Sequence, residues 1–221
     1  PEAVLALQAD PNFEVAIGST EGEPILAMNN SRAPLNDIRV RQAIAHAIDR
    51  QAIIDGAMFG FGTPIGTHFA PHHPAYVDLI ATYPHDPARA RALLADAGQS
   101  DLKLTLKLPP PTYARRGGEI VAAQLKEAGI TVEIIPVEWA QWLEQVFRGT
   151  DYDLTIVSHT EPVDIGIYAR DTYYFNYDSP SLKALMARLN NTSDQAARNR
   201  ILGQAQRTIT SDSVSAYMFQ L

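Results

Sequence analysis

The sequence contains no cysteine, and this absence excludes a disulfide framework and catalysis by a thiol. It also has no run of about 18 apolar residues, so we expect no transmembrane helix. Basic residues are outnumbered, with 18 Lys and Arg against 25 Asp and Glu, and the only tight basic cluster is Arg115-Arg116. The formal net charge of −7 argues against nucleic acid as a partner, because nucleic-acid binding depends on clustered Lys and Arg.

What is present is typical of a globular chain with one sizeable core, since 46% of its 221 residues are hydrophobic and 19% are charged. The clearest strand is residues 102–108, where leucines alternate with Lys103, Thr105 and Lys107. This period of two predicts a strand with one buried face. Further strands are predicted at residues 13–18, 24–28, 131–136 and 154–157. Because predicted helices separate most of these strands, the pattern indicates an α/β sheet whose ligands bind beyond the strand ends.

Helix signals lie in several places. Residues 37–58 read as helical, with Asn36 or Asp37 as the N-cap and a break near Asp49, which can cap a second helix. Asp86 is expected to cap the next helix, and Gly98 to close it. Further helices are predicted at residues 2–8, 115–128, 139–147 and 182–189. Ser193 is expected to cap a last helix, whose inward-facing apolar residues end at Ile209. Three arginines of the first region are expected to point mostly to water: Arg39, Arg41 and Arg50.

Four motifs occur in a characteristic order along the chain. They are the stretch from Asn29 to Arg50, the stretch Tyr83–Gly98, the stretch Gln124–Val132, and Val137-Glu138-Trp139 followed by Tyr152-Asp153. Together they resemble the extracellular solute-binding proteins of ABC transporters, family 5, the oligopeptide/dipeptide-binding group. The resemblance implies a periplasmic binding protein type II-like lobe, an α/β fold with a mixed sheet flanked by helices.

The resemblance also implies a division of the chain. The sequence opens at Pro1-Glu2-Ala3-Val4 without a basic or apolar export signal, whereas a first lobe carrying that signal precedes these residues in the family. We therefore expect a C-terminal lobe without its partner lobe. Residues 1–28 are expected to be an interlobe or hinge segment, residues 29–214 the C-terminal lobe, and residues 215–221 a strand returning to the missing first lobe.

The function implied by the resemblance is binding without catalysis. The receptor is expected to capture a peptide-like or other small polar solute by closure of two lobes, and to deliver it to an ABC transporter permease. A monomer in the periplasm, or tethered outside the membrane, is expected, with no cofactor. The sequence leaves the ligand open, because relatives take peptides, opines, glycans or nickel complexes.

The segment from Ser158 to Gly166 is the main candidate for ligand contact, because it directly follows a predicted strand. Its candidate ligand-binding residues are His159, Thr160, Glu161 and Asp164. In peptide-binding relatives an aspartate ahead of an acid-proline pair binds the terminal ammonium of the ligand. Here the position a few residues ahead of Glu161-Pro162, where that aspartate is expected, holds Ser158. Glu161 itself is therefore the candidate for that role. A solvent-exposed loop is the alternative.

Aromatic residues supply two further candidates. Trp139 and Trp142 can share a helix face, and the resemblance favours Trp139 as the ligand-facing ring, with Trp142 in the core. Tyr113 lies at a strand-to-helix junction, where helix-start amides can bind an anion or simply form a capping turn. An aromatic-rich stretch at residues 168–177 can contact a ligand or pack onto the sheet.

Histidines and carboxylates leave other kinds of site to consider. His68 and His72 are four residues apart, but Pro71 and Pro74 prevent a shared helix, and no nearby Cys or carboxylate completes a ligand spacing. We therefore expect no metal site and no catalytic residue. Two other functions stay open: a hydrolase that pairs Glu138 with Glu161 or Asp164, and a sensory or chaperone-like ectodomain.

Overall fold

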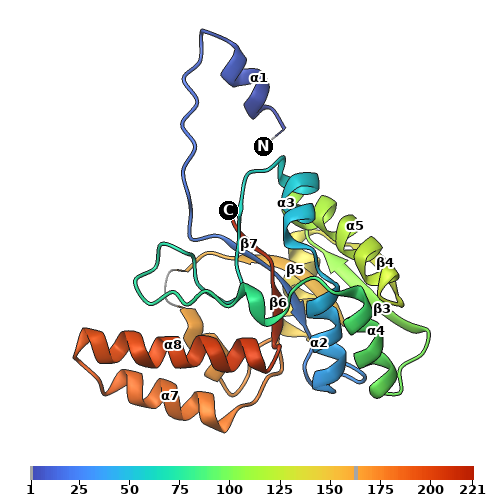
Figure 1. Ribbon diagram of the computed structural model, residues 1–221, viewed down its shortest axis with the longest axis vertical. Coiled ribbons are helices and arrows are strands. Elements are labelled where there is room, and N and C mark those ends of the chain that lie inside the picture. The colour runs from blue at the N-terminus through green and yellow to red at the C-terminus, as the bar shows by residue number, and fades with distance from the viewer. Residues whose placement is uncertain (1, 162–163) are drawn as a thin grey trace.

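A five-stranded mixed sheet forms the centre of the computed structural model, which describes residues 2–161 and 164–221 (Figure 1). Its order is β4-β3-β5-β1-β6, with β3 parallel to β4 and β5, and β1 antiparallel to β5 and β6. The strands are β1 Glu23–Met28, β3 Leu102–Leu108, β4 Ile130–Pro136, β5 Leu154–His159 and β6 Ser215–Tyr217. A two-stranded pairing joins β2 Thr63–Pro64 to β7 Phe219–Gln220.

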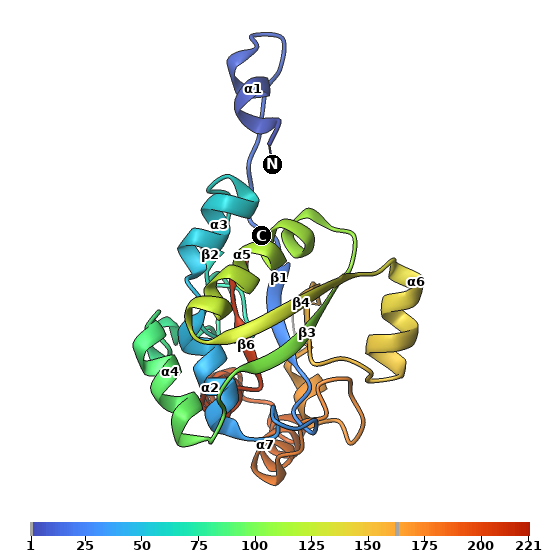
Figure 2. The same cartoon turned by 90° about the vertical axis from the view of Figure 1, so that its right-hand side faces the viewer.

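Helices cover both faces of this sheet, and β1 is buried throughout (Figure 2). Leu26 and Met28 of β1 face one core, and Ile25 and Ala27 face the other. The first core is closed by α2 Ile38–Ala47, α3 Arg50–Met58, α4 Pro87–Asp96 and α5 Thr112–Glu127. The second is closed by α6 Trp139–Trp142, the π-helix η2 Leu143–Arg148, α7 Pro180–Asn190 and α8 Gln195–Ser211. The expected α/β fold with a mixed sheet flanked by helices is confirmed.

Short 3-10 helices and one peripheral helix complete the chain. The 3-10 helices are η1 Ile80–Thr82 and η3 Asp164–Ala169. Helix α1, Val4–Ala9, stands apart from the main body and has no buried residue (Figure 1). Among the described residues, no helix has the length and apolar character that a membrane span requires.

The predicted helix caps of the first region are present. The Asp37 carboxylate accepts a hydrogen bond from the Arg39 backbone N–H, and the Asp49 carboxylate accepts one from the Ala52 N–H. Helix α4 likewise begins at Pro87 after the Asp86 cap. Gly98, with a φ of 70°, follows this helix as expected. These caps are local interactions, so the sequence alone is sufficient to place them.

Two of the three arginines expected in water are buried, and that prediction is wrong. Arg41 and Arg50 each expose 7% of their surface. Both guanidiniums donate to backbone carbonyls from segments distant in sequence, Arg41 to Ser213 and Arg50 to Tyr217. These hydrogen bonds offset the cost of burying a cation.

Four other local predictions also differ from the structure. Residues 13–18 form no strand, and Asp194 rather than Ser193 caps the last helix. The helix predicted at residues 139–147 changes to a π-helix after Trp142. The single buried face expected for residues 102–108 is also wrong, because Lys107 is only 8% exposed.

Segments near the two ends of the chain pair with each other at the sheet. Strands β1 and β6 pair with each other, with Ile25 opposite Tyr217. Beyond them, the Thr20 N–H donates to the Leu221 carbonyl and the Leu221 N–H donates to the Gly22 carbonyl, both at 2.8 Å. The division at residues 28 and 214 stays a prediction, and both segments contribute a strand to the same central sheet.

Candidate functional site

A cavity of about 400 Å³ lies at the carboxyl end of β5, the position at which α/β sheets bind ligands. Five of the six residues predicted to bind ligand line it: Trp139, His159, Thr160, Glu161 and Asp164. The structure therefore brings these side chains together, and their contact with a ligand stays a prediction. Pro162 and Val163, from the same predicted segment, lie outside the described residues.

Tyr113, the sixth predicted residue, is placed differently. It does not line the cavity, and its hydroxyl accepts a hydrogen bond from the Ser158 backbone N–H at 3.2 Å. Burial raises the pKa of this phenol above its ordinary value. Tyr113 thus connects the start of α5 to Ser158 of β5, which lines the cavity.

An aromatic and aliphatic stripe forms one wall of the cavity. Trp139, Leu143 and Phe147 follow one another at intervals of four residues, and all three are exposed by about 40%. Trp142 is only 5% exposed, and its indole N–H donates to Thr155 Oγ1 at 2.9 Å. The indole rings of Trp139 and Trp142 meet edge to face with centroids 5.7 Å apart. This wall offers apolar surface to an occupant of the cavity.

The floor of the cavity contains a carboxylate held between two imidazoles. Asp164 Oδ1 lies 2.5 Å from His68 Nε2, and Asp164 Oδ2 lies 3.3 Å from His159 Nδ1. Burial opposes ionisation of Asp164, but the hydrogen bonds from His159 and His68 outweigh it and hold the pKa of this carboxyl well below its ordinary value. Burial lowers the pKa of His68, which is 1% exposed. Asp164 is therefore an anion at neutral pH beside a neutral His68.

A second carboxyl group, that of Glu23, lies close to the His68 imidazole. Glu23 on β1 is paired in register with His159 on β5, so both side chains project from one face of the sheet. Glu23 Oε2 lies 3.7 Å from His68 Nδ1. Burial, and then the charge of Asp164, raise the pKa of Glu23 to about 9. This carboxyl is therefore protonated at neutral pH.

His68 is the residue of this site that the sequence did not identify. Its neighbours in sequence lie elsewhere, since His72 is exposed and pairs with Glu21, and His73 stacks on Phe69. The carboxylate missing from the local spacing is Asp164, 96 residues further along the chain. No local pattern signals that contact.

The aromatic stretch at residues 168–177 serves two purposes at this site. Tyr173 and Tyr174 line the cavity together with Arg170. Tyr168 and Phe175 are each 1% exposed and belong to the second core. Packing on the sheet is therefore present in Tyr168 and Phe175, whereas ligand contact by this stretch stays a prediction.

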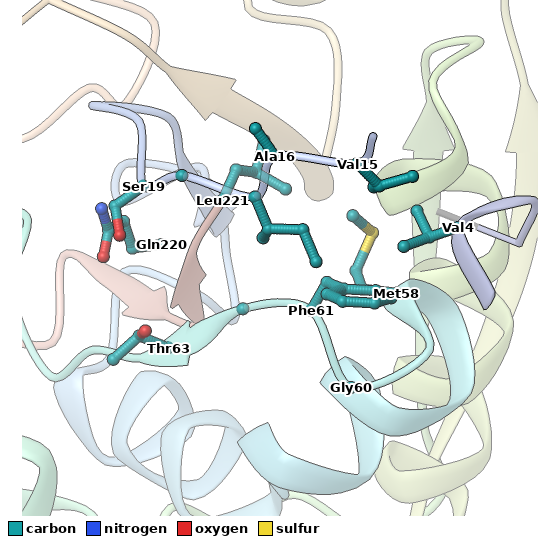
Figure 3. Close-up of a pocket in the computed structure, with 13 residues that line it drawn as sticks. Val4, Val15, Ala16, Ser19, Met58, Gly60, Phe61, Thr63, Gln220 and Leu221 are labelled. Atoms are coloured by element: carbon teal, nitrogen blue, oxygen red, sulfur yellow. The ribbon is translucent and has the colours of Figure 1, made fainter. Parts of the chain in front are cut away.

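Another cavity, of about 500 Å³, lies where the N-terminal segment crosses the end of α3 (Figure 3). Val4, Val15, Met58, Phe61 and Leu221 direct their side chains toward one another there. No titratable side chain is among its lining residues. Because it offers no polar group to fix a ligand's orientation beyond Ser19, Thr63 and Gln220, the cavity beside β5 is the better candidate.

Comparison with known proteins gives a consistent picture. The family model of bacterial extracellular solute-binding proteins, family 5, matches residues 1–181. Heme-binding protein A of Haemophilus influenzae is 28% identical over 149 residues, which cover 65% of this chain and 27% of that protein. Di/tripeptide-binding protein 1 of Pseudomonas aeruginosa is 27% identical over 225 residues, which cover 95% of this chain and 42% of that protein.

A solved structure shares the fold over the whole chain. The periplasmic binding protein DppA from Helicobacter pylori, in complex with the peptide STSA, matches with a TM-score of 0.89 at 24% identity. The match covers 99% of this chain and 45% of that protein. The chain thus spans less than half the length of each of these proteins.

Proposed function

The chain belongs to the bacterial extracellular solute-binding proteins of family 5, and we propose that it forms one lobe of a periplasmic receptor that captures a small solute. The second lobe, which supplies the opposite wall of the cavity, corresponds to the part of the relatives that this chain does not cover. Closure of the two lobes on the solute shifts an open–closed equilibrium, and the closed form delivers the solute to an ABC transporter permease.

The observation that carries this proposal is the gathering of Trp139, His159, Thr160, Glu161 and Asp164 around one cavity beside β5. The cavity combines an apolar wall with a few polar groups, which is the usual composition of a small-molecule site. In this proposal the second lobe encloses the ligand from the opposite side. The alternative of a sensory or chaperone-like ectodomain uses the same cavity, and a neighbouring permease gene would favour transport.

The solute class that fits this cavity best is a short peptide or a similar molecule with a primary ammonium. Both oxygens of Asp164 already accept hydrogen bonds from imidazoles. Glu161 is exposed at the rim, and its Oε2 accepts a hydrogen bond from the Thr160 N–H at 3.3 Å. Glu161 is therefore the carboxylate with capacity to pair with a ligand ammonium.

A catalytic role finds little support in the geometry. Glu138, one member of the carboxylate pair considered for a hydrolase, lies 3.5 Å from the Arg115 guanidinium and caps α6. Asp164, a second member, is fixed between His68 and His159. The relatives described above have names of binding proteins, and binding without turnover is the function we propose.

Calorimetric titration of the full-length protein with di- and tripeptides tests the proposal. We expect the full-length protein to bind and this chain alone to bind far more weakly, because half of a two-lobed site keeps only part of the contacts. Equal affinities of the two would contradict a shared cleft. A thermal-shift screen against peptide and sugar libraries identifies the best probe beforehand.

The role of Glu161 has its own test in the full-length protein. Glu161→Gln is expected to weaken binding of a dipeptide by about 10- to 100-fold, the effect of losing a charge-assisted hydrogen bond. Glu144→Gln is the matched control, because Glu144 is exposed on the neighbouring π-helix and does not line the cavity. Peptides acetylated at the amino terminus carry no ammonium there and should bind the two variants with equal affinity. Tighter binding of acetylated peptides to the Glu144→Gln variant than to the Glu161→Gln variant would argue against the ammonium pairing.

A further inference from the structure

Two imidazoles and one carboxylate converge at the floor of the cavity, and this group has the composition of a metal site. The ligand atoms of His68, His159 and Asp164 all lie within 4.8 Å of one another. Among the described residues, it is the only group of three His, Cys, Asp or Glu side chains arranged in this way. Two histidines with one carboxylate form a recurrent ligand set for zinc and for other first-row transition metals.

One distance within this group equals the spacing that a metal ion imposes, and another is shorter. In a tetrahedral site with bonds of about 2.0–2.1 Å, neighbouring ligand atoms lie about 3.3 Å apart. The His159 Nδ1–Asp164 Oδ2 distance is 3.3 Å, and the His68 Nε2–Asp164 Oδ1 distance is 2.5 Å. The second distance is about 0.8 Å shorter than this spacing, so binding of an ion requires His68 and the Asp164 carboxylate to move apart.

The outer nitrogen of each imidazole is held by a tyrosine, as in sites where a second layer of groups orients the ligands. The Tyr168 hydroxyl lies 3.0 Å from His68 Nδ1, and the Tyr174 hydroxyl lies 2.9 Å from His159 Nε2. Both phenols are buried, so the two rings are fixed from behind. This leaves His68 Nε2 and His159 Nδ1 directed at the same point, beside Asp164.

The buried hydroxyl of Tyr217 completes this second layer. When the His68 Nδ1–H donates to the Tyr168 oxygen, the Tyr168 proton needs an acceptor of its own. The Tyr217 hydroxyl is a neighbour of Tyr168, is buried, and has no hydrogen-bond partner by geometry among the described residues. It can therefore accept that proton.

The charges of the site also favour a cation. Two carboxyl groups, those of Glu161 and Asp164, line the cavity. Arg170 is the only cationic side chain among the described residues that line the cavity, and it lies over the Tyr173 ring rather than beside Asp164. A divalent ion offsets this excess of acidic groups.

We infer that His68, His159 and Asp164 bind one divalent first-row transition metal ion, with Zn²⁺ the best match to their geometry. His159 and Asp164 line the cavity and His68 lies beneath them, so the remaining coordination position of the ion faces the cavity. An amine nitrogen, a carboxylate oxygen or a water oxygen in the cavity can fill that position. The site then favours solutes that carry a metal-chelating group.

Titration of the 221-residue chain with ZnCl₂ tests this inference, using protein prepared without a polyhistidine tag. Calorimetry is expected to show one ion per chain. Asp164→Asn and His159→Gln are each expected to weaken binding about 100-fold or more, because each removes a ligand atom. His72→Gln is the matched control, since His72 also pairs with a carboxylate at 2.5 Å but is exposed and has no third ligand.

A second measurement uses the unmodified chain, so that the test does not depend on the variants folding. Imidazole ¹⁵N resonances of His68 Nε2 and His159 Nδ1 should shift when Zn²⁺ is added, and those of His72 and His85 should not. No stoichiometric binding, or unchanged affinity in both ligand variants, overturns the inference. The site belongs to this chain alone, so its failure and a failure of solute capture are separate results.

Discussion

The buried guanidinium of Arg41 donates a hydrogen bond from Nε to the carbonyl of Ser213 at 3.1 Å. Its two other nitrogens donate to the carbonyls of Asp212 and Leu35, at 2.9 and 2.8 Å. Asp212 is the C-cap of α8, where helix carbonyls lack partners within the helix. One side chain of α2 thus satisfies three carbonyls and places a positive charge at the negative end of α8.

Replacing this arginine should destabilise the chain. Arg41→Met keeps the aliphatic stem but leaves three carbonyls, two of them in buried contacts, without this donor, and we expect a loss of about 3 kcal/mol of unfolding free energy. Urea denaturation followed by circular dichroism measures the loss. Arg39→Met on the same helix is the control, because Arg39 is exposed and its partners stay solvated. Similar losses for both variants would mean that Arg41 is not buried.

Arg41 also illustrates what the sequence could and could not predict. The caps at Asp37, Asp49 and Asp86 were predictable because each carboxylate bonds an N–H two or three residues away. The Ser213 carbonyl that Arg41 binds lies 172 residues away, and no periodicity reports such a contact. Amphipathic spacing assigned Arg41 to water because a helical wheel does not show which polar positions meet unpaired carbonyls.

The candidate site divides in the same way. The loop after β5 was predictable from its position, because ligands dock beyond strand ends in α/β sheets. His68 was not, since it reaches Asp164 only through the folding of the segment that follows β2. The sequence was sufficient to locate the cavity through one strand and the loop after it. The contact of His68 with the Asp164 carboxylate could be found only from the structure.

Two adjacent glycines in α5 should respond in opposite directions to the same substitution. A Cβ at Gly118 would lie 2.3 Å from Leu108 Cδ1, inside the first core, whereas a Cβ at Gly117 meets nothing closer than Ile53 Cγ2 at 3.7 Å. Gly118→Ala is expected to cost about 1–3 kcal/mol through overpacking. Gly117→Ala should gain about 0.5–1 kcal/mol, because alanine loses less backbone entropy in a helix. Chemical denaturation distinguishes the two, and stabilisation by both would show that α5 packs less closely on β3.

The pairing of Lys107 with Asp151 predicts a dependence of stability on pH. Lys107 Nζ lies 3.2 Å from Asp151 Oδ2 and donates to the Asp151 carbonyl at 2.6 Å. Hydrogen bonds from Lys107 and then Arg32 lower the pKa of Asp151 below its ordinary value of 3.8. The folded state therefore favours the carboxylate, and the resulting stabilisation is present above pH 3.8 and disappears as the pH falls through the lower folded-state value.

Thermal denaturation of the wild type and Asp151→Asn from about pH 2 to pH 7 measures this effect. The wild type should be the more stable at neutral pH, by a small margin because Asp151 is largely exposed. The difference between the two melting temperatures should shrink as the carboxylate becomes protonated. A difference that stays constant over the whole range would mean that the pairing contributes nothing.

The two tryptophans give a last prediction, because each single substitution leaves one fluorescent reporter. Trp142→Phe removes the indole donor from buried Thr155 Oγ1, and we expect a loss of about 1–2 kcal/mol of unfolding free energy. Trp139→Phe should leave stability nearly unchanged, since 41% of Trp139 is exposed.

Iodide should quench the fluorescence of Trp139 in the Trp142→Phe variant and spare that of Trp142 in the Trp139→Phe variant. In the full-length protein, a bound peptide should shield Trp139 from iodide, whereas unchanged quenching would remove Trp139 from the ligand-facing wall.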